Sequence, residues 1–596
     1  MRLSLFLSLF PGDATPSPRF SETPKPRSLA MQKYGRRFLR SVLVLISSIL
    51  TLCASPEAGA DRVVRMAPVI VEASSGNPWR YFTLPGFEVL SRCPDGFTET
   101  YARALQDDVA ASAALFPPGF VERLPTPIKI VLYCRPPEKE AAFAPGNPID
   151  LQFVPLADAV LGATFIEQAA PVVVDDGDTF INCGNYSSVI RDVQDLSVDP
   201  DTDILLQLRT PTFPAWFKAG VTGRFGVFSH RIIQSTFNGR VFARFPNASW
   251  ISHDDTLALQ KSHPGPRSLL PLSALFDGSG RNSQRELWES EAGLFVRWGL
   301  FAKEPDGTDH RSALIRFVGR TTTEPTTEQM FRECFGMGFA EAEHRLDIYL
   351  LRAVTETIAV PVGSTSYVPL DIRDARPEEI GRILGDWARF EARHSRSGIA
   401  GFAESGFRQE SMDRAAKLFE RTYANGCRTP LFLASYGLYK AQIGDQIAAR
   451  KALESATGTG VVRPRAYVEL ARLRLELGLP YAEQGFGDLS QKDYSAILQL
   501  LTVAPTQMPS LHSSYQLLVR LLEHAPRAPT REELDVLGKA VRLFPQNAAF
   551  ACRVATLYQH CGFQDEAAAI IKRARQFAES DDGRAQLSGF DSPRVP

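Results

Sequence analysis

The spacing of apolar residues changes near Glu286, from short strand-like runs to long helical periodicity. Runs of β-branched and apolar residues predict strands in the earlier part. These runs are Phe87–Cys93, Ile128–Cys134, Pro171–Val174 and Phe180–Cys183. Between the first two, Thr98–Ala114 has apolar residues at helical spacing. The N-terminal part is therefore predicted to open with a strand, a helix and a second strand.

A hairpin and a group of helices are predicted next. Arg231–Phe237 and Arg240–Phe245 flank Asn238-Gly239, a dipeptide that suits a type I′ turn because both of its residues tolerate positive φ. Helical periodicity then predicts helices at Glu286–Phe301, Arg311–Val318, Thr327–Phe335 and Phe339–Val354. The extended pattern of Ile358–Tyr367 is interpreted as a linker into the next unit.

Residues 372–580 carry an internally repeated helical pattern. The segment LFLASYGLYKAQIG follows Pro430, and RAYVELARLRLELG follows Pro464, which lies 34 residues further along (464 − 430). Gly437 and Ala471 occupy the same place in these copies, and Ala555 occupies it in a copy that starts at Ala548. A small residue at a fixed place lets two helices approach closely, so stacked helix pairs are predicted.

This spacing and these residue types resemble the tetratricopeptide repeat. The resemblance implies an all-α solenoid in which each helix pair buries its apolar face on the next pair. Such an array presents a groove to a protein or peptide partner. An ordinary helical bundle is the alternative, and Glu483–Pro509, which departs from the interval, is interpreted as a degenerate pair.

Three segments of the central region carry a second resemblance. They are the segment PAWFKAG at Pro214–Gly220, the run Leu270–Phe276 before the helix at Glu286–Phe301, and Phe331–Leu351. Their order resembles the gluzincin "peptidase MA-like" metallopeptidase domain of bacterial exported proteins. The resemblance implies a fold of the α+β class, with a zincin-like domain followed by an all-α tetratricopeptide-like solenoid.

The zinc site of that family has no counterpart in this sequence. Such a site needs two histidines one helical turn apart, an adjacent glutamate as general base and a third ligand. The chain has no histidine before His230, no glutamate between Glu167 and Glu286, and Ala219 at the third-ligand position. Trp216, Ala219 and Gly220 are therefore positions of a degenerate site. The resemblance implies a pseudoenzyme with no catalytic residue, metal or cofactor.

An active enzyme is the alternative. His230, His253, Ser229 and Asp254 lie near one another in the sequence, but no G-x-S-x-G motif surrounds any serine. The sequence also contains no P-loop and no dinucleotide-binding fingerprint. An envelope hydrolase with an unrecognised non-zinc site, whose repeats recruit substrate, remains the rival hypothesis.

A secretory signal is predicted after Met31. Basic residues follow it, an apolar run covers Ser41–Cys53, and Ala58-Gly59-Ala60 has the small residues that a signal peptidase reads. The run is shorter than the ~20 residues that span a bilayer. An uncleaved membrane anchor is the alternative interpretation, and membrane contact is expected only through this segment. The expected location is periplasmic or outer-envelope associated, in a bacterium.

Composition and charge exclude several classes of partner. The chain is 44% hydrophobic and 22% charged, as in folded soluble proteins, and its formal net charge is −1. This balance gives no reason to expect nucleic acid or an anionic membrane as partner. Cys93 and Cys134 end two predicted strands and are candidates for a disulfide, or for two half-buried thiols.

Five side chains of the repeats are candidates for partner binding: Tyr436, Tyr439, Tyr467, Arg472 and Tyr558. The tyrosines line a peptide groove in one interpretation and fill the seam between helices in the other. Arg472 either grips an acidic partner segment or belongs to a solvated helix face.

These patterns divide the chain into seven parts and predict a non-catalytic, exported protein-binding or scaffold protein. The parts are a non-native or disordered extension (1–30), a signal peptide (31–60), an N-terminal linker (61–84), a peptidase-like domain without metal (85–357), a linker (358–371), the helical repeats (372–580) and a disordered tail (581–596).

Overall fold

The computed structural model describes most of the chain from residue 78 onward. The described residues are 78–118, 120, 127–132, 172–175, 178–182, 206, 209–222, 227, 233–237, 240–245, 269–303, 307, 309–363, 368–394, 402–479, 488–507, 510–577 and 581–588. The predicted signal and the first 30 residues lie outside them. Among the helices of these ranges, none is both long and apolar enough to cross a membrane.

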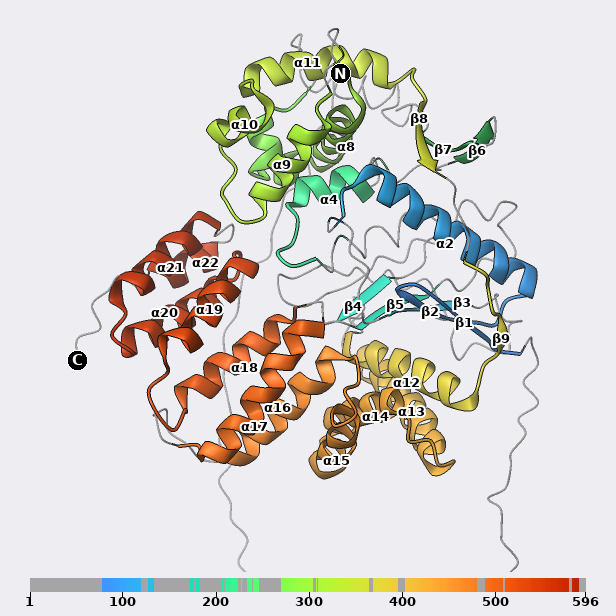
Figure 1. The fold of residues 1–596 in the computed structure, drawn as a ribbon, viewed down its shortest axis with the longest axis vertical. Helices are drawn as coiled ribbons and strands as arrows, with labels where there is room; N and C mark the ends of the chain where they lie inside the picture. Colours follow the sequence, from blue (N-terminus) through green and yellow to red (C-terminus); the bar gives the residue numbers. More distant parts are fainter. Residues whose placement is uncertain are drawn as a thin grey trace, which may run out of the picture. The chain divides into compact units, whose positions relative to one another are not determined.

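A mixed six-stranded sheet has the strand order β4-β5-β3-β2-β1-β9. Its strands are β1 (Arg80–Leu84), β2 (Phe87–Ser91), β3 (Ile128–Leu132), β4 (Val172–Asp175), β5 (Asp178–Asn182) and β9 (Arg373–Asp374). β2 and β3 are parallel neighbours, joined by the crossover helix α2 (Asp95–Leu115). The predicted strand–helix–strand opening and the two later strands are confirmed. Figure 1 shows α2 on one side of this sheet and α12 (Pro377–His394) on the other.

The edge of the sheet differs from the sequence-based prediction. β1 pairs antiparallel with β2, although residues 61–84 were expected to form a linker. β9 pairs antiparallel with β1, although it lies at the start of the predicted repeats. The Arg80 guanidinium bridges this edge, with contacts of 2.7 Å to Asp95 and 2.5 Å to Asp374. β9 has only two residues and therefore no periodicity that could predict it, and its pairing with the distant strand β1 identifies it as a strand.

A second, three-stranded sheet has the order β6-β7-β8. β6 (Ile233–Phe237) and β7 (Arg240–Phe245) form the predicted antiparallel hairpin, with Phe237 opposite Arg240. The turn residues Asn238-Gly239 lie outside the described ranges. β8 (Ile358–Gly363) pairs antiparallel with β7. Much of the segment that was interpreted as a linker is therefore an integral strand.

Helices with a shared aromatic core surround α8 in this front region. They are α4 (Ala215–Thr222), α6 (Leu272–Phe276), α7 (Ser279–Ser283), α8 (Arg285–Phe301), α9 (Arg311–Thr321), α10 (Glu328–Phe335) and α11 (Phe339–Ala353). The four helices predicted after Glu286 are confirmed. Their core is continuous and rich in Phe and Trp, including Phe295, Phe317 and Phe331, each fully buried.

Five consecutive helix pairs make up the described part of the repeat region. They are α12 with α13 (Phe402–Ala424), α14 (Pro430–Gln442) with α15 (Gln446–Thr457), α16 (Pro464–Gly478) with α17 (Gln491–Val503), α18 (His512–Glu523) with α19 (Arg531–Leu543), and α20 (Ala548–His560) with α21 (Gln564–Phe577). The short 3₁₀ helix η2 (Ala504–Gln507) follows α17, and α22 (Asp581–Ser588) packs on α20 and α21. The first helix of each pair contacts the first helix of the next pair.

The small residues that defined the repeat lie at close helix contacts. Gly437, Ala471 and Ala555 are buried, and a Cβ placed on Gly437 would lie 2.6 Å from Leu453 Cγ on the second helix of its pair. The repeat region is therefore a tetratricopeptide-like array of stacked helix pairs. The irregular segment supplies α17, the second helix of the pair that α16 begins. The protein is mostly helical, with a mixed sheet near its N-terminal part.

Candidate functional site

The aromatic position of the predicted degenerate peptidase site is part of the core. Trp216 is 1% exposed on α4. Its ring centroid lies 5.1 Å from that of Phe276, 5.5 Å from Phe295 and 5.8 Å from Phe317. The neighbouring Phe217 is fully buried as well. Both side chains therefore hold α4 against the surrounding helices.

The other two degenerate positions are shaped by helix packing. A Cβ placed on Gly220 would lie 2.4 Å from the carbonyl oxygen of Ala292 on α8, so α4 and α8 are in backbone contact there. Ala219 is half-buried against the same core. The preceding segment, where a zincin helix would lie, falls mostly outside the described residues. Across the described ranges, no three His, Cys, Asp or Glu side chains are grouped as a metal site would require.

The four candidate tyrosines are buried inside the array. Tyr436, Tyr439, Tyr467 and Tyr558 are 5%, 3%, 4% and 4% exposed. The Tyr436 hydroxyl donates to Glu420 Oε2 at 3.1 Å, and the Tyr558 hydroxyl donates to the Leu534 carbonyl at 2.7 Å. Burial, reinforced by nearby carboxylates, raises the pKa of Tyr436 and of Tyr558 to about 12. These side chains fill the inter-helix seams, which supports the second interpretation over a peptide groove.

Arg472 belongs to a charged row along α16. Its guanidinium lies 2.5 Å from a carboxylate oxygen of Glu469 and 2.5 Å from one of Glu476. Hydrogen bonds from the guanidinium to Glu469 outweigh the effect of burial and raise the pKa of Arg472. Its charge is therefore compensated within its own helix.

The first helices of the later pairs present a polar surface, named here the first-helix face. It consists of half-buried and exposed side chains of α16, α18 and α20: Glu469, Arg472, Glu476, Gln516, Arg520, Glu523 and Arg553. Arg553 of α20 pairs with Glu523 of α18 at 2.5 Å, which ties neighbouring pairs together. Gln516 is exposed at its middle. This face presents charged and amide side chains to solvent, and the apolar side chains beneath it are buried.

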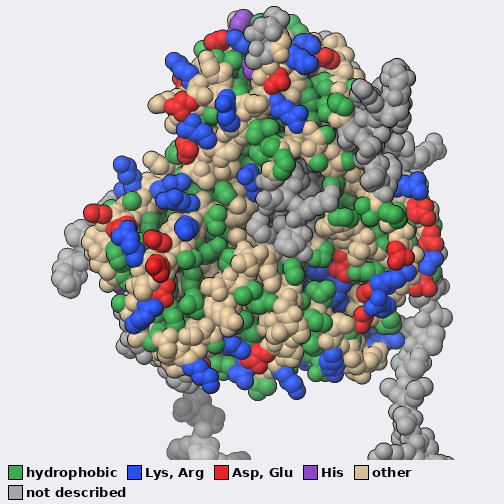
Figure 2. All heavy atoms as spheres, viewed as in Figure 1, with side chains coloured by type: hydrophobic (Ala, Val, Ile, Leu, Met, Phe, Trp, Pro, Cys, Tyr) green, Lys and Arg blue, Asp and Glu red, His purple; other side chains and the backbone are tan. Residues whose placement is uncertain are grey.

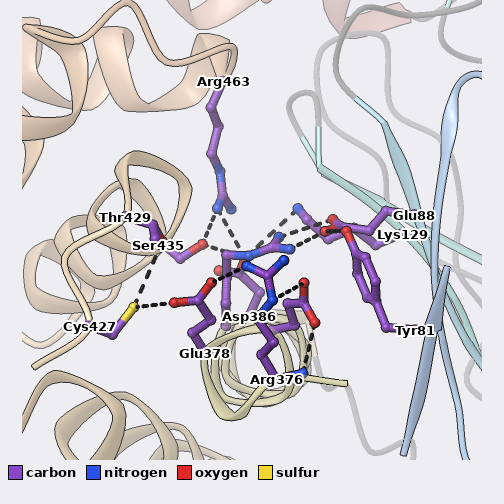
Figure 3. A network of polar contacts seen from close by, with 12 residues as sticks. Tyr81, Glu88, Lys129, Arg376, Glu378, Asp386, Cys427, Thr429, Ser435 and Arg463 are labelled. Carbon is purple, nitrogen blue, oxygen red and sulfur yellow. Dashed lines mark hydrogen bonds and ion pairs between the residues drawn. The ribbon is translucent and has the colours of Figure 1, made fainter. Parts of the chain in front are cut away.

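The first pair differs, because its first helix α12 packs on the sheet. Asp386 of α12 is fully buried and is the centre of a polar network (Figure 3). Its Oδ2 accepts hydrogen bonds from Ser435 Oγ on α14 at 2.7 Å and from Arg463 Nη1 at 3.0 Å. Lys129 of β3 lies 3.8 Å from the same oxygen, and Arg389 of α12 lies 3.6 Å from Oδ1. One carboxylate thus joins the sheet to the first three pairs.

Cations set the charge state of Asp386. Burial alone would raise the pKa of this carboxyl group, because a low-dielectric interior disfavours the charged form. The charges of Arg463, Lys129 and Arg389 outweigh burial and hold its pKa below the usual value. Asp386 is therefore ionised at neutral pH.

A second ion pair extends the network across the sheet. Glu88 of β2 lies opposite Lys129 in the parallel register. Arg382 of α12 donates to both carboxylate oxygens of Glu88, and the Tyr81 hydroxyl donates to Oε1 at 2.7 Å. Leu90 and Val131, next on the same face, pack on Ile383 and Leu384 of α12.

The network is a structural junction and not a reaction centre. Glu88, Lys129, Arg382, Asp386 and Arg463 are at most 5% exposed. A substrate cannot reach carboxylates that are buried and already bonded to several cations. The junction buries Asp386 of α12 and Ser435 of α14.

Sequence reasoning did not identify this junction. Lys129 stands inside the apolar run IKIVLYC and Glu88 inside FEVLS. A charged residue at a buried strand position signals a buried ion pair, because isolated charges are not tolerated there. The two charges lie in predicted strands, but Arg382 lies 294 positions after Glu88 and Asp386 lies 257 positions after Lys129 (386 − 129), so these partners were not identifiable.

The predicted disulfide is only partly addressed. β2 and β3 are neighbours, with Ser91 opposite Leu132, so the premise that the two strands pair is confirmed. Cys93 is buried just beyond β2. Cys134 lies outside the described residues, and its pairing with Cys93 stays a prediction.

Comparison with protein-family models and with curated proteins finds no match. Among solved structures, MamA is 14% identical over 32% of this chain and 99% of its own, with a TM-score of 0.24. TTC0263, a thermophilic TPR protein of Thermus thermophilus, is 20% identical over 31% and 93%, with a TM-score of 0.22. Yeast Tom70 is 13% identical over 56% and 77%, with a TM-score of 0.19. At these scores the similarities carry no functional argument, and the tetratricopeptide-like assignment rests on the helix pairs and their spacing.

Proposed function

We propose that this chain is an exported, non-catalytic protein-binding or scaffold protein of the bacterial cell envelope. In this proposal the helix pairs dock a peptide or protein, and the front region is a metallopeptidase-like domain without its metal. The signal-like segment after Met31 supports export, and the missing histidines before His230 support loss of catalysis.

One observation carries the proposal: the first-helix face of α16, α18 and α20 is polar and partly exposed, above a buried apolar core. Its side chains are already held in place by ion pairs such as Arg553–Glu523. A face that is ordered before binding loses little conformational entropy when a partner docks. Stacked repeats commonly use such extended surfaces for recognition.

The junction around Asp386 gives the front region a role in the same proposal. It anchors the sheet to the first helix pairs through Lys129 and Glu88. The front region thereby covers the beginning of the array and leaves the later pairs to bind. Its proposed role is to hold and orient the bound partner, not to cleave it.

Site-specific photo-crosslinking in cells tests the proposal. A photoreactive side chain at Gln516, exposed on α18, is expected to capture a discrete partner. The same side chain at Asp535, exposed on the second helix α19, is the matched control and is expected to capture much less. Equal capture at both positions, or none at either, would contradict docking on the first-helix face.

A parallel measurement addresses the enzymatic alternative. Purified protein that begins near Asp61 is analysed for metals and incubated with unstructured protein substrates. Bound zinc in a one-to-one ratio together with peptide cleavage would overturn the non-catalytic proposal.

A further inference from the structure

A groove lies between α2 and the segment of chain that precedes β9. One wall is the exposed side of α2, and the other is the stretch Val368–Leu370. The groove encloses about 370 Å³, within the range of about 300–1,000 Å³ that is typical of binding clefts. We name it the α2 groove, and its lining residues are Glu99, Arg103, Gln106, Val368, Pro369 and Leu370.

The α2 wall of the groove is a row of polar side chains. Glu99, Arg103 and Gln106 follow one another at intervals of four and three residues, so they lie on one face of the helix. The side chains of Glu99 and Arg103 are 51% and 63% exposed and lie 3.9 Å apart. Such an exposed ion pair is weak, so both groups can also bond to a ligand. Figure 2 shows acidic and basic side chains side by side along the margin where Figure 1 places the start of α2.

The opposite wall is a stretch of main chain whose polar groups face the groove. Pro369 restricts the preceding Val368 to an extended conformation. The Val368 amide donates to Gln106 Oε1 on α2 at 2.7 Å, so this edge of the stretch faces α2. Main-chain groups two residues apart point the same way in an extended chain. The Leu370 amide and carbonyl therefore face α2 as well.

The Leu370 main-chain groups are available to a ligand. In the part of the chain that the structure describes, β9 pairs with β1 only at Arg373 and Asp374, and no hydrogen bond reaches the Leu370 amide or carbonyl. Val368 is 43% exposed and Leu370 is half-buried, so the same wall also provides apolar surface. A free main-chain donor and acceptor on one edge are the groups with which another extended chain pairs.

We infer that the α2 groove is a docking site for an extended peptide segment of a partner protein, held chiefly by its main chain. One edge of the segment pairs with the Leu370 amide and carbonyl. The other edge bonds to α2, where Glu99 accepts from peptide amides and Arg103 donates to peptide carbonyls. An extended chain has donors and acceptors on both edges, and the two walls match them. The inference rests on the proposed protein-binding function and adds a second contact in the front region.

The chemistry of the walls favours an extended peptide over other ligands. Nucleic acid or an anionic lipid needs several cations for its phosphates, whereas the groove has one, beside a carboxylate. A helical segment uses its main-chain groups internally and has none to give to Leu370. Side chains of an extended segment point alternately into the groove and out to solvent. The apolar surface of Val368 and Leu370 therefore favours apolar residues at alternate positions of the partner segment.

Direct binding to the full mature chain tests the inference. The probe is a fluorescent peptide of alternating residues, Thr-Val-Thr-Val-Thr, followed by fluorescence anisotropy. Its control carries an N-methyl group on both valine amides, which removes main-chain donors and keeps the side chains. Leu370→Pro removes the amide donor of the groove, and Leu370→Val is its matched control because it retains that amide.

A second variant addresses the helical wall and combines Glu99→Ala with Arg103→Ala. Its matched control combines Glu328→Ala with Arg332→Ala, an ion pair of the same spacing on α10 whose side chains are 50% and 66% exposed. Both pairs lie on the surface, so the two variants differ chiefly in whether they alter the groove.

The unaltered chain is expected to bind the N-methylated peptide about tenfold more weakly than the unmodified one, the loss that one or two main-chain hydrogen bonds account for. Leu370→Pro is expected to bind the unmodified peptide about tenfold more weakly than Leu370→Val, and the α2 variant about fivefold more weakly than its control. Equal affinity for the two peptides, or equal affinity of Leu370→Pro and Leu370→Val, would overturn the inference. Should circular dichroism show that Leu370→Pro does not fold, the two peptides and the α2 variant decide in the same way.

The proposed function and this inference can fail separately. Capture at Gln516 together with equal affinity for the two peptides would remove the α2 groove as a docking site and leave the protein-binding function standing. Absence of capture at Gln516 together with specific loss in Leu370→Pro would do the reverse, moving binding away from the first-helix face.

Discussion

The front region and the helical array are stabilised over very different distances along the chain. In the array, Gly437 packs against Leu453 on the next helix. In the front sheet, Arg80 bonds to Asp374 and Glu88 bonds to Arg382, and each pair is separated by 294 positions. The array can therefore be assembled pair by pair, whereas the sheet edge is complete only when the start of the array has reached it.

The two regions also solve helix packing differently. The array repeats small residues at one place in each pair, so that backbones approach. The front region surrounds α8 with large aromatic side chains, among them Trp216 and Phe295 at a centroid distance of 5.5 Å. At Gly220 it uses the small-residue solution instead. The comparison suggests four tests, from the largest expected effect to the smallest.

Removing the shared carboxylate should have the largest effect. Asp386→Ala leaves Lys129, Arg389 and Arg463 buried without their common anion, and breaking a buried pair in this way typically costs about 3–5 kcal/mol. Denaturant unfolding, followed by tryptophan fluorescence and by circular dichroism, measures the loss. Glu410→Ala, at an exposed position of α13, is the control and should change stability little. Equal stabilities of the two variants would contradict the junction.

Adding a methyl group at the close helix contacts should destabilise the front region more than the array. Gly220→Ala places a Cβ 2.4 Å from a backbone oxygen that cannot move aside, and Gly437→Ala places one 2.6 Å from a leucine side chain that can. Both are expected to lose about 1–3 kcal/mol, with the greater loss at Gly220. Gly319→Ala, with nothing within 4 Å of the added Cβ, should instead gain up to ~1 kcal/mol from helix propensity. Thermal unfolding of the three variants gives the order.

Acid should weaken the array through Glu533 of α19. Burial would raise the pKa of this carboxyl group, but hydrogen bonds from Arg527, the Thr530 backbone and Tyr494 lower it to about 2. The ordinary value for an unfolded chain is ~4.3. Since the folded pKa is the lower one, the stabilisation is present above pH ~4.3 and is lost as the pH falls toward 2.

The size of that effect is small, because the Arg527 side chain that pairs with Glu533 is 53% exposed and solvent screening limits such contacts to about 1 kcal/mol. Glu533→Gln should flatten the pH dependence of the unfolding free energy between pH ~4.3 and 2. Glu532→Gln, at the exposed neighbouring position, is the comparison. An identical pH profile for the unaltered chain and Glu533→Gln would contradict the prediction.

The smallest effect is expected at Arg472. Its two ion pairs lie along one helix at partial exposure, and each is worth about 0.3–0.5 kcal/mol. Arg472→Gln should therefore cost less than ~1 kcal/mol in denaturant unfolding and leave crosslinking at Gln516 in place. Loss of the crosslink with unchanged stability would instead assign Arg472 directly to the partner.

Prediction from the sequence succeeded where the signal was local. The hairpin at Asn238-Gly239, the helix Glu286–Phe301 and the repeated pairs after Pro430 each follow from spacing within a few turns. It missed β9, it took much of β8 for a linker, and it left open whether Tyr436 faces a groove or a seam. Burial of Tyr436 depends on α12 and α13 packing over it, and no property of its own helix reveals that.

The sequence by itself determined the stacked pairs of the array. The small residues Gly437, Ala471 and Ala555 lie at close helix contacts, and such contacts form between helices that are near one another in the sequence. It also determined that no zinc motif of the expected kind precedes Trp216, since the histidines are missing. Tertiary structure alone decided where the sheet ends and what neutralises Asp386. Those outcomes depend on groups from separate segments meeting in a buried, low-dielectric place, where a charge is stable only beside its partners.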